Sequence, residues 1–218
     1  GEVPDPHIVT EAGTRYRVQV LRGQNHGLFL DMAEGRRWVH AHVANHPEHR
    51  HGIKVLNLFA YTCAFSVVAL QAGARHVMNM DMAQGALATG QQNHRLNDLS
   101  GASFLAPDIF SSWGKITRGG PYHLIVVDPP SYQKGSFVAT KDYPRLMRRL
   151  PDLLAPGGQA LLCLNAPELG PAFLQDAMRD GRLKGLARGV AWPISENGGA
   201  VDRALVAADA RALIRSER

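Results

Sequence analysis

Short apolar runs alternate with longer helix-like stretches along this chain, and that alternation limits the folds open to it. Five runs have the length and composition of strands: residues 53–58, 76–80, 102–106, 122–127 and 159–164. Three stretches have the periodicity of helices: residues 63–72, 84–96 and 141–154. Strands that alternate with helices in this way form a parallel sheet covered by helices on both faces. We therefore expect a Rossmann-like fold of the α/β class.

The two ends of the chain predict smaller additions to that sheet. Residues 14–20 alternate apolar and polar side chains, and a polar turn separates them from Leu28-Phe29-Leu30, which predicts a β-hairpin. A helix should follow from Ala33 to about Asn45. Near the other end, residues 186–192 and 203–208 flank Gly198-Gly199 and predict a closing antiparallel pair. We expect a mostly parallel sheet of seven strands in residues 51–218, with residues 1–50 as a hairpin and helix appendage.

Composition excludes some classes of protein and favours others. Hydrophobic residues make up 45% of the chain, but no apolar run approaches the roughly 18 residues that span a bilayer, so we expect no membrane insertion. Two cysteines are too few for a disulfide framework, and the start does not resemble a signal peptide, so we expect a cytoplasmic protein. The formal net charge of +5 favours a polyanionic partner, although a basic surface alone explains it equally well. The sequence does not indicate an oligomeric state.

Aspartates end three successive predicted strands, at Asp81, Asp108 and Asp128. An aspartate at one strand end is as often a helix cap as a ligand contact, but three in succession are harder to explain as caps. In an open parallel sheet, ligands bind outside the carboxyl ends of the strands, and a carboxylate there accepts hydrogen bonds from ribose hydroxyls. The three aspartates therefore predict a nucleoside pocket.

The loop after the first strand is the second candidate element of that pocket. Residues 57–65 open a helix whose backbone N–H groups could receive an anionic group. The loop lacks the Gly-x-Gly-x-x-Gly pattern that lets a backbone approach a pyrophosphate, which argues against a nicotinamide-dependent oxidoreductase.

Asp128-Pro129-Pro130-Ser131-Tyr132 is the sharpest motif of the chain. Two prolines after a very apolar strand fix an extended backbone and leave one carbonyl directed outward. A carboxylate beside that carbonyl can hold an amino or ring nitrogen, and Tyr132 could stack on a base. The alternative is a rigid turn with a packed tyrosine.

Together these motifs resemble the class I S-adenosylmethionine-dependent methyltransferases, most closely those that modify bacterial large-subunit ribosomal RNA. The segment Gly27-Leu28-Phe29-Leu30-Asp31, followed by Arg36 and Arg37, also resembles that group. The resemblance implies that the residues after the first strand hold the methionine part of the cofactor, Asp81 its ribose, and Asp108 its adenine amino group. It implies that Asp128, Pro129, Pro130 and Tyr132 face the acceptor. The full set of implied cofactor-binding residues is Asn57, Phe59, Ala60, Tyr61, Thr62, Cys63, Asp81, Met82, Asp108 and Asp128.

Two departures from the family pattern bear on chemistry. Family members usually carry two glycines where this chain has Cys63-Ala64, which suggests a tighter loop or weaker cofactor binding. A non-catalytic RNA-binding module on the same scaffold is therefore an alternative. Members that methylate cytosine at carbon have a nucleophilic cysteine just after the fifth strand, where this chain has Asn165. Cys163 lies within the strand and reads as a buried structural thiol, so we expect in-line transfer of methyl to a base nitrogen of RNA, without a covalent adduct.

Two further clusters of side chains could bind a metal or phosphates. Five histidines lie close in sequence: His40, His42, His46, His49 and His51. They have no neighbouring carboxylate-rich segment or cysteine pair, so we expect no metal site. Arg145, Arg148 and Arg149 fall on one side of a predicted helix and predict phosphate contacts, or else a solvated helix face.

Overall fold

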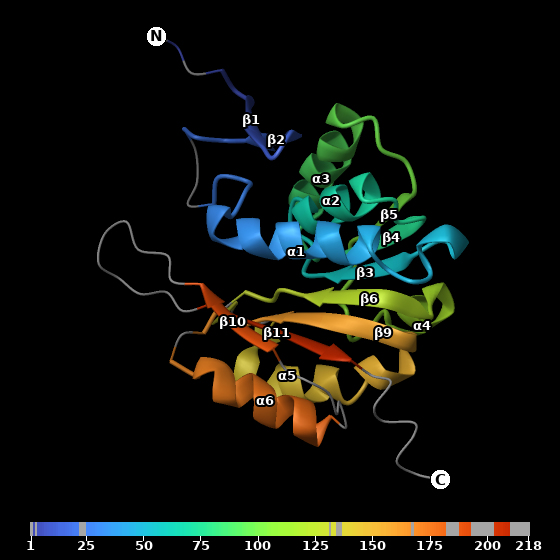
Figure 1. The fold of residues 1–218 in the computed structure, drawn as a ribbon. Helices are drawn as coiled ribbons and strands as arrows, with labels where there is room; N and C mark the ends of the chain where they lie inside the picture. Colours follow the sequence, from blue (N-terminus) through green and yellow to red (C-terminus); the bar gives the residue numbers. More distant parts are fainter. Residues whose placement is uncertain are drawn as a thin grey trace. The chain divides into compact units, whose positions relative to one another are not determined.

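The computed structural model describes residues 2, 4–21, 25–130, 132–133, 137–166, 168–181, 188–192 and 203–209. Residue contacts divide the chain into two units, a first unit of Gly1–Ile109 and a second unit of Phe110–Arg218. The ribbon in Figure 1 labels the helices and strands of both.

The first unit contains three parallel strands in the order β3-β4-β5. They are β3 (Lys54–Leu58), β4 (His76–Met80) and β5 (Ala102–Leu105). Each pair of successive strands is joined by a helix, α2 (Ala64–Gln71) and then α3 (Gln84–Leu96). The register sets Leu58 opposite Met80 and Met80 opposite Leu105, so the carboxyl ends of the three strands lie level with one another.

The sequence predicts these elements well because each carries a strong local signal. Four of the five β3 residues are buried, as expected for a strand covered on both faces. In α2, the six residues from Phe65 to Leu70 are all buried, and the chain leaves that helix through Gly73 at φ +95°, the predicted left-handed cap. The helix α1 (Ala33–Ala44) also matches its prediction and packs against α2.

The predicted hairpin exists, but its partner strand was wrong. β2 (Thr14–Val18) pairs antiparallel with β1 (His7–Glu11), through a tight turn at Ala12-Gly13 where both residues have positive φ. The segment Leu28–Leu30 is not a strand, and a 3-10 helix, η1, spans Leu30–Met32. Prediction failed here because the two-residue turn at Ala12-Gly13 carries only one of the usual turn residues.

The second unit also has a parallel core. β6 (Tyr122–Val127) runs parallel to β9 (Leu154–Cys163). The predicted closing pair is confirmed: β11 (Arg203–Asp209) lies antiparallel to β9 and to β10 (Arg188–Trp192). The connection through Gly198-Gly199 lies outside the described residues. Two short strands, β7 (Tyr132–Gln133) and β8 (Phe137–Val138), pair after the Asp128 motif.

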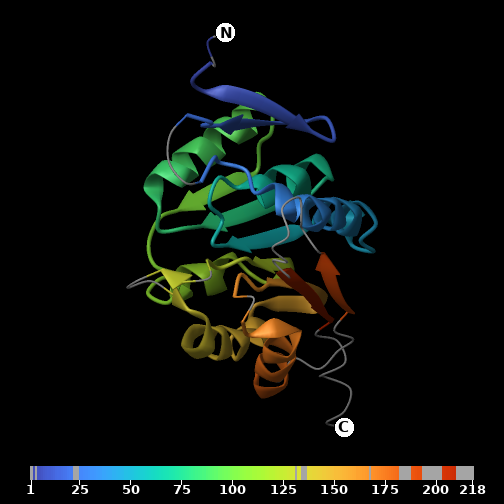
Figure 2. The same ribbon diagram turned by 90° about the vertical axis from the view of Figure 1, so that its left-hand side faces the viewer.

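Helices of the second unit differ from prediction in two places. The helix expected at 141–154 is α5 (Ala139–Met147) followed by the 3-10 helix η3 (Leu150–Asp152), because β9 already begins at Leu154 and includes the glycines expected to form a turn. The helix α6 (Gly170–Asp180) was not predicted. Figure 2 shows α5 and α6 side by side, and α4 (Trp113–Gly119) precedes β6. Among the described residues, no helix is long and apolar enough to cross a membrane.

Candidate functional site

The loop between β3 and α2 has an unusual backbone. Phe59, Tyr61 and Cys63 adopt positive φ values of 58°, 46° and 62°, although none of them is glycine. Each such residue costs on the order of 1 kcal/mol or more, and strained residues of this kind cluster at ligand-binding loops. The loop therefore has the left-handed turns that glycines usually provide, built here from residues with side chains.

Hydrogen bonds hold this backbone in place. The Ala60 N–H donates to the Met80 carbonyl at 3.0 Å, and the Cys63 N–H donates to the Ala60 carbonyl at 2.7 Å. The Thr62 hydroxyl, which is buried, donates to the Gly27 carbonyl at 2.6 Å. The segment around Gly27 that resembles the family therefore braces the predicted cofactor loop.

Asp81 connects this loop to the end of β4. Its Oδ2 accepts the Tyr61 N–H and its Oδ1 accepts the Ala83 N–H, both at 2.8 Å. An ionised carboxylate has about four acceptor sites, so two bonds leave capacity for ribose hydroxyls. Asp81 thus orders both flanking loops.

Cys63, the residue that departs from the family's glycines, lies inside the first unit. Its side chain is fully buried and packs with Ala60 and Leu87. Burial raises the pKa of its thiol well above the ordinary value, and Asp81 raises it further, so the thiol is unreactive. The space for it comes from Gly90 in α3, where a Cβ would stand 2.5 Å from the Cys63 Sγ.

A buried polar chain begins at Asn57, the first of the predicted cofactor residues. Asn57 donates to Asn79 at 2.9 Å, Asn79 donates to the Ser66 hydroxyl at 3.0 Å, and Ser66 bonds to His94 at 2.8 Å. The other ring nitrogen of His94 lies 2.7 Å from the Gly90 carbonyl. Desolvation lowers the pKa of His94, although this carbonyl opposes the shift. The Asn57 Oδ1 is buried and finds no partner among the described residues.

Two other predicted cofactor residues, Met82 and Asp108, lie at strand ends of the same unit. Met82 follows Asp81 with 52% of its surface exposed, and Asp108 follows β5 and is partly buried. The Tyr61 ring contacts that of Phe29 in a tilted arrangement, with the ring centres 5.3 Å apart, and burial raises the pKa of the Tyr61 hydroxyl.

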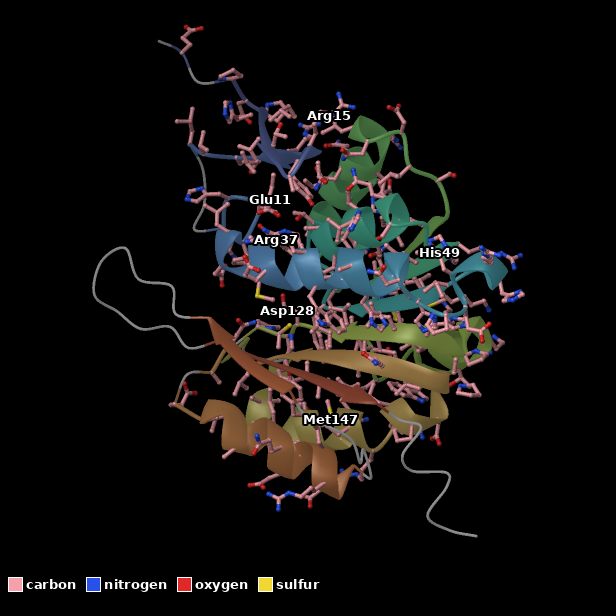
Figure 3. The ribbon with its side chains drawn as sticks, viewed as in Figure 1. Glu11, Arg15, Arg37, His49, Asp128 and Met147 are labelled. Carbon is pink, nitrogen blue, oxygen red and sulfur yellow. The ribbon has the colours of Figure 1, made fainter. Side chains whose placement is uncertain are left out.

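In the second unit, the Asp128 motif is held by Asn165. The Asn165 Nδ2 donates to the Asp128 Oδ1 at 3.0 Å and to the Pro129 carbonyl at 2.6 Å. Sequence reasoning placed Asn165 after the fifth strand but did not predict this contact. Asp128 follows β6 and Asn165 follows β9. Because these two strands are parallel neighbours, their pairing is the signal from which the contact could have been predicted. Figure 3 labels Asp128 among the side chains.

A buried tyrosine lies near the motif. The Tyr143 hydroxyl, from α5, donates to the Cys163 carbonyl. Burial raises the pKa of Tyr143 well above its ordinary value, and Cys163 and Asp128 add to the shift. Cys163 is 1% exposed within β9, as predicted for a structural thiol. Pro130 is partly buried, and the side chain of Tyr132 lies outside the described residues.

The histidine cluster is structural where the structure describes it. His42 stacks on Trp38 with ring centres 4.8 Å apart and meets His46 edge-on, while His49 bonds to the Ala72 carbonyl. Within the described part of the chain, no three histidine, cysteine or carboxylate side chains gather in a way that could hold a metal.

Two of the predicted phosphate-binding arginines lie over aromatic rings. The Arg145 guanidinium lies 4.0 Å from the centre of the Phe110 ring, and that of Arg149 lies 4.7 Å from the Trp113 ring. All three arginines are exposed, including Arg148, which lies between the other two in the sequence. Stacking on a ring leaves the N–H groups of a guanidinium available to phosphates.

A cavity of about 360 Å³ lies in the first unit, beside the hairpin and α1. Glu11 and Arg37, labelled in Figure 3, line it together with Arg36. Arg36 is 2% exposed and forms two bonds of 2.6 and 2.7 Å with Glu11, so this ion pair holds the hairpin to the helix. None of the predicted site residues is part of the cavity's described lining.

A family model described as S-adenosylmethionine-dependent methyltransferase matches residues 1–187. The chain belongs to this family. The match to this methyltransferase family confirms the resemblance predicted from the strand-end motifs, and with it the cofactor class. It does not assign a role to any single residue.

Curated relatives within the family carry more specific names. The "Ribosomal RNA large subunit methyltransferase I" of Aeromonas salmonicida is 32% identical over 168 residues, which cover 74% of this chain and 41% of that protein. The "Ribosomal RNA large subunit methyltransferase K/L" of a Psychrobacter species is 35% identical over 161 residues, covering 70% of this chain and 19% of that protein. The chain thus spans less than half the length of these relatives.

Solved methyltransferase structures share the fold. A S-adenosylmethionine-dependent methyltransferase from Agrobacterium tumefaciens superposes with a TM-score of 0.81 at 20% identity, covering 94% of this chain and 69% of that one. A structure solved in complex with SAH gives a TM-score of 0.79 at 24% identity, covering 95% and 57%. This likeness confirms a Rossmann-like α/β methyltransferase fold.

Proposed function

We propose that this chain transfers a methyl group from S-adenosylmethionine to a base nitrogen of large-subunit ribosomal RNA. The observation that carries the choice of nitrogen is the contact between Asn165 and Asp128 at 3.0 Å. An amide stands where relatives that methylate cytosine at carbon have a nucleophilic cysteine, and the nearby Cys163 is buried within β9. A carboxylate held by an amide suits the orientation of a nitrogen nucleophile.

The first unit supplies the residues proposed to bind the cofactor. Its strained loop fits the group, because the positive φ values at Phe59, Tyr61 and Cys63 give the backbone the path of a glycine loop, while the Cys63 side chain is directed into the core. We assign the methionine part to Phe59–Cys63, the ribose to Asp81, and the adenine amino group to Asp108. Asn57 and Met82 complete this set.

Little acid or base chemistry is needed in such a transfer. Bound S-adenosylmethionine supplies a methyl group on a sulfonium, whose sulfur keeps the bonding pair as the base nitrogen forms its bond to carbon. Asp128 would orient that nitrogen through its N–H, disperse the positive charge that develops on it, and accept the departing proton for release to solvent.

Several observations support RNA as the acceptor. The formal net charge is +5, and the arginines stacked on Phe110 and Trp113 present cations beside aromatic rings. Proteins that bind RNA commonly combine these two features. The names of the curated relatives point the same way. Tyr132 is proposed to stack on the target base.

Three architectural expectations remain part of this proposal. They are a single sheet of seven strands, the division into residues 1–50 and 51–218, and a cytoplasmic location. The closing antiparallel strands and the parallel cores of both units support the first of them.

The test is methyl transfer from labelled S-adenosylmethionine to large-subunit ribosomal RNA prepared without its modifications. Wild-type protein should label the RNA, and digestion to nucleosides should place the label on a base nitrogen. Label on a carbon atom would contradict the nitrogen assignment. Failure of the wild type to label any RNA, with cofactor binding intact, would contradict RNA as the acceptor.

A further inference from the structure

The amide of Asn165 has only one possible orientation. Its two contacts are the Asp128 Oδ1 at 3.0 Å and the Pro129 carbonyl at 2.6 Å. A carbonyl only accepts, and so does an ionised carboxylate, so the atom between them must be the amide nitrogen. Both of its hydrogens are used in these two bonds, and the amide cannot turn over without losing them.

The other end of that amide is an unused acceptor. The Asn165 Oδ1 is buried and no group of the described residues donates to it. Buried side-chain acceptors in folded proteins nearly always have a donor, and each exception calls for an explanation. An exception attached directly to the Asp128 motif is explained if a bound molecule supplies the donor.

The contact with Asn165 also changes the hydrogen-bond acceptors available at the two-proline turn. The sequence predicts one outward carbonyl in this turn, beside the Asp128 carboxylate. In the structure, the Pro129 carbonyl already accepts the shorter of the two Asn165 bonds. The Asn165 amide therefore takes one of the two acceptor sites of this carbonyl and brings a further acceptor of its own.

We propose that Asn165 Oδ1 is the second acceptor for the target base beside Asp128. The Asp128 carboxylate and the Asn165 Oδ1 are both acceptors, so the base must present two N–H hydrogens on one edge. Adenine, cytosine and guanine provide them through an exocyclic amino group, whereas uracil has a single ring N–H. The substrate class is therefore a base that carries an amino group. This inference rests on the proposed function.

The test measures methyl transfer to unmodified large-subunit ribosomal RNA by the Asn165→Ala and Asn45→Ala variants. Asn45 is an exposed asparagine at the end of α1 that donates to Ala41, and serves as the matched control. We expect Asn165→Ala to lower kcat about tenfold to a hundredfold, the loss typical of one or two hydrogen bonds. The Kd for S-adenosylmethionine should not change, and the control should retain wild-type turnover. The labelled nucleoside should derive from adenosine, cytidine or guanosine.

A second variant separates this role from simple support of the fold. In Asn165→Asp, the new carboxyl can donate to Asp128 only when it is protonated, because two carboxylates at this distance share one proton. Its kcat relative to wild type should therefore rise as the pH falls, which a purely structural defect would not produce.

The possible results separate failure of this inference from failure of the proposed function. Labelled RNA with equal kcat for wild type and Asn165→Ala, a label on uridine, or an Asn165→Asp ratio independent of pH would each overturn the inference while the proposed function stands. If wild type labels no RNA, the proposed function fails and the inference fails with it.

Discussion

The Cys63 thiol lies against the backbone of Gly90, so closely that a Cβ at position 90 would stand 2.5 Å from Sγ and 3.0 Å from the Cys63 Cβ. Cys63 has left-handed backbone geometry and precedes α2, while Gly90 lies in the middle of α3. A side chain at the left-handed position before α2 is therefore accommodated by a glycine in the facing helix.

This pairing predicts a coupled effect of two substitutions. Gly90→Ala should lower the free energy of unfolding by about 1 to 3 kcal/mol, because the added methyl overpacks the contact. It should also weaken cofactor binding, since the loop must shift. Adding Cys63→Gly should recover most of both losses, because the thiol is then gone. Denaturant unfolding and calorimetry with S-adenosylmethionine measure the two effects.

Gly85 provides the control, since it lies in the same helix and a Cβ there meets nothing within 4 Å. Gly85→Ala should raise stability by about 0.5 to 1 kcal/mol through helix propensity. If Gly90→Ala behaves like Gly85→Ala, the contact with Cys63 does not shape the loop.

Asp81 is predicted to matter twice, for the loop and for the cofactor. Asp81→Ala removes the acceptor for the Tyr61 and Ala83 N–H groups and the proposed partner of the ribose. Cofactor binding should weaken by about 1 to 3 kcal/mol, the loss expected when hydrogen bonds to a charged group disappear. Calorimetry with Asp152→Ala, an exposed aspartate in η3, is the comparison. Equal affinity of both variants would remove Asp81 from the cofactor site.

Asp128→Ala should abolish methyl transfer with little change in cofactor affinity. A misplacement of about 1 Å can cost about a hundredfold in rate, and this variant loses the acceptor carboxylate that Asn165 positions.

Tyr132→Ala should instead weaken RNA binding by about 1 to 3 kcal/mol if the ring stacks on a base.

Cys163→Ser should remain active, because that thiol is buried within β9. A folded, cofactor-bound Cys163→Ser protein without activity would indicate covalent chemistry.

The central elements could be predicted from the sequence because local signals agree with their environment. β4, α3 and β6 have the predicted bounds, since each is followed at once by a turn residue or an aspartate. The hairpin partner could not be predicted, because pairing depends on long-range register as well as local pattern. The helix α6 was missed because Pro171 and Gly170 at its start resemble a loop.

In the candidate site too, features with a local sequence signal could be predicted and those that depend on long-range contacts could not. Strand-end positions predicted where Asp81, Asp108 and Asp128 lie. The orientation of Asn165 toward Pro129, and the burial of Cys63 against Gly90, arise from contacts between residues 36 and 27 positions apart. No local pattern encodes such contacts.

The stacked arginines lead to a salt-dependent prediction. Each phosphate contact that is lost should reduce the slope of log Kd for RNA against log salt concentration by about 0.7 for a single strand. Arg145→Gln and Arg149→Gln should each show this change if both guanidinium groups contact phosphates. Arg179→Gln, an exposed arginine of α6 paired with Asp176, should not. Unchanged slopes in all three variants would leave the arginines as a solvated helix face.

His42 predicts how stability depends on pH. Its Nε2 is buried without a partner among the described residues, and its ring lies between Trp38 and His46. Desolvation, aided by His46, lowers the pKa of His42 from 6.5 to about 4. The unfolded chain therefore binds a proton more readily than the folded one, and stability should fall as the pH drops from about 6.5 toward 4.

Replacing the ring tests this. In His42→Phe, the loss of unfolding free energy between pH 7 and pH 5 should be smaller than in wild type by up to about 2 kcal/mol, because the proton-binding site is removed while the stack on Trp38 remains. Val39→Ala, a buried substitution in the same helix, should lower stability equally at both pH values, since valine does not titrate. Denaturant unfolding at the two pH values measures the difference. If His42→Phe loses as much stability as wild type on acidification, the sensitivity arises at other groups, among them His94 and His76, whose pKa values are also lowered.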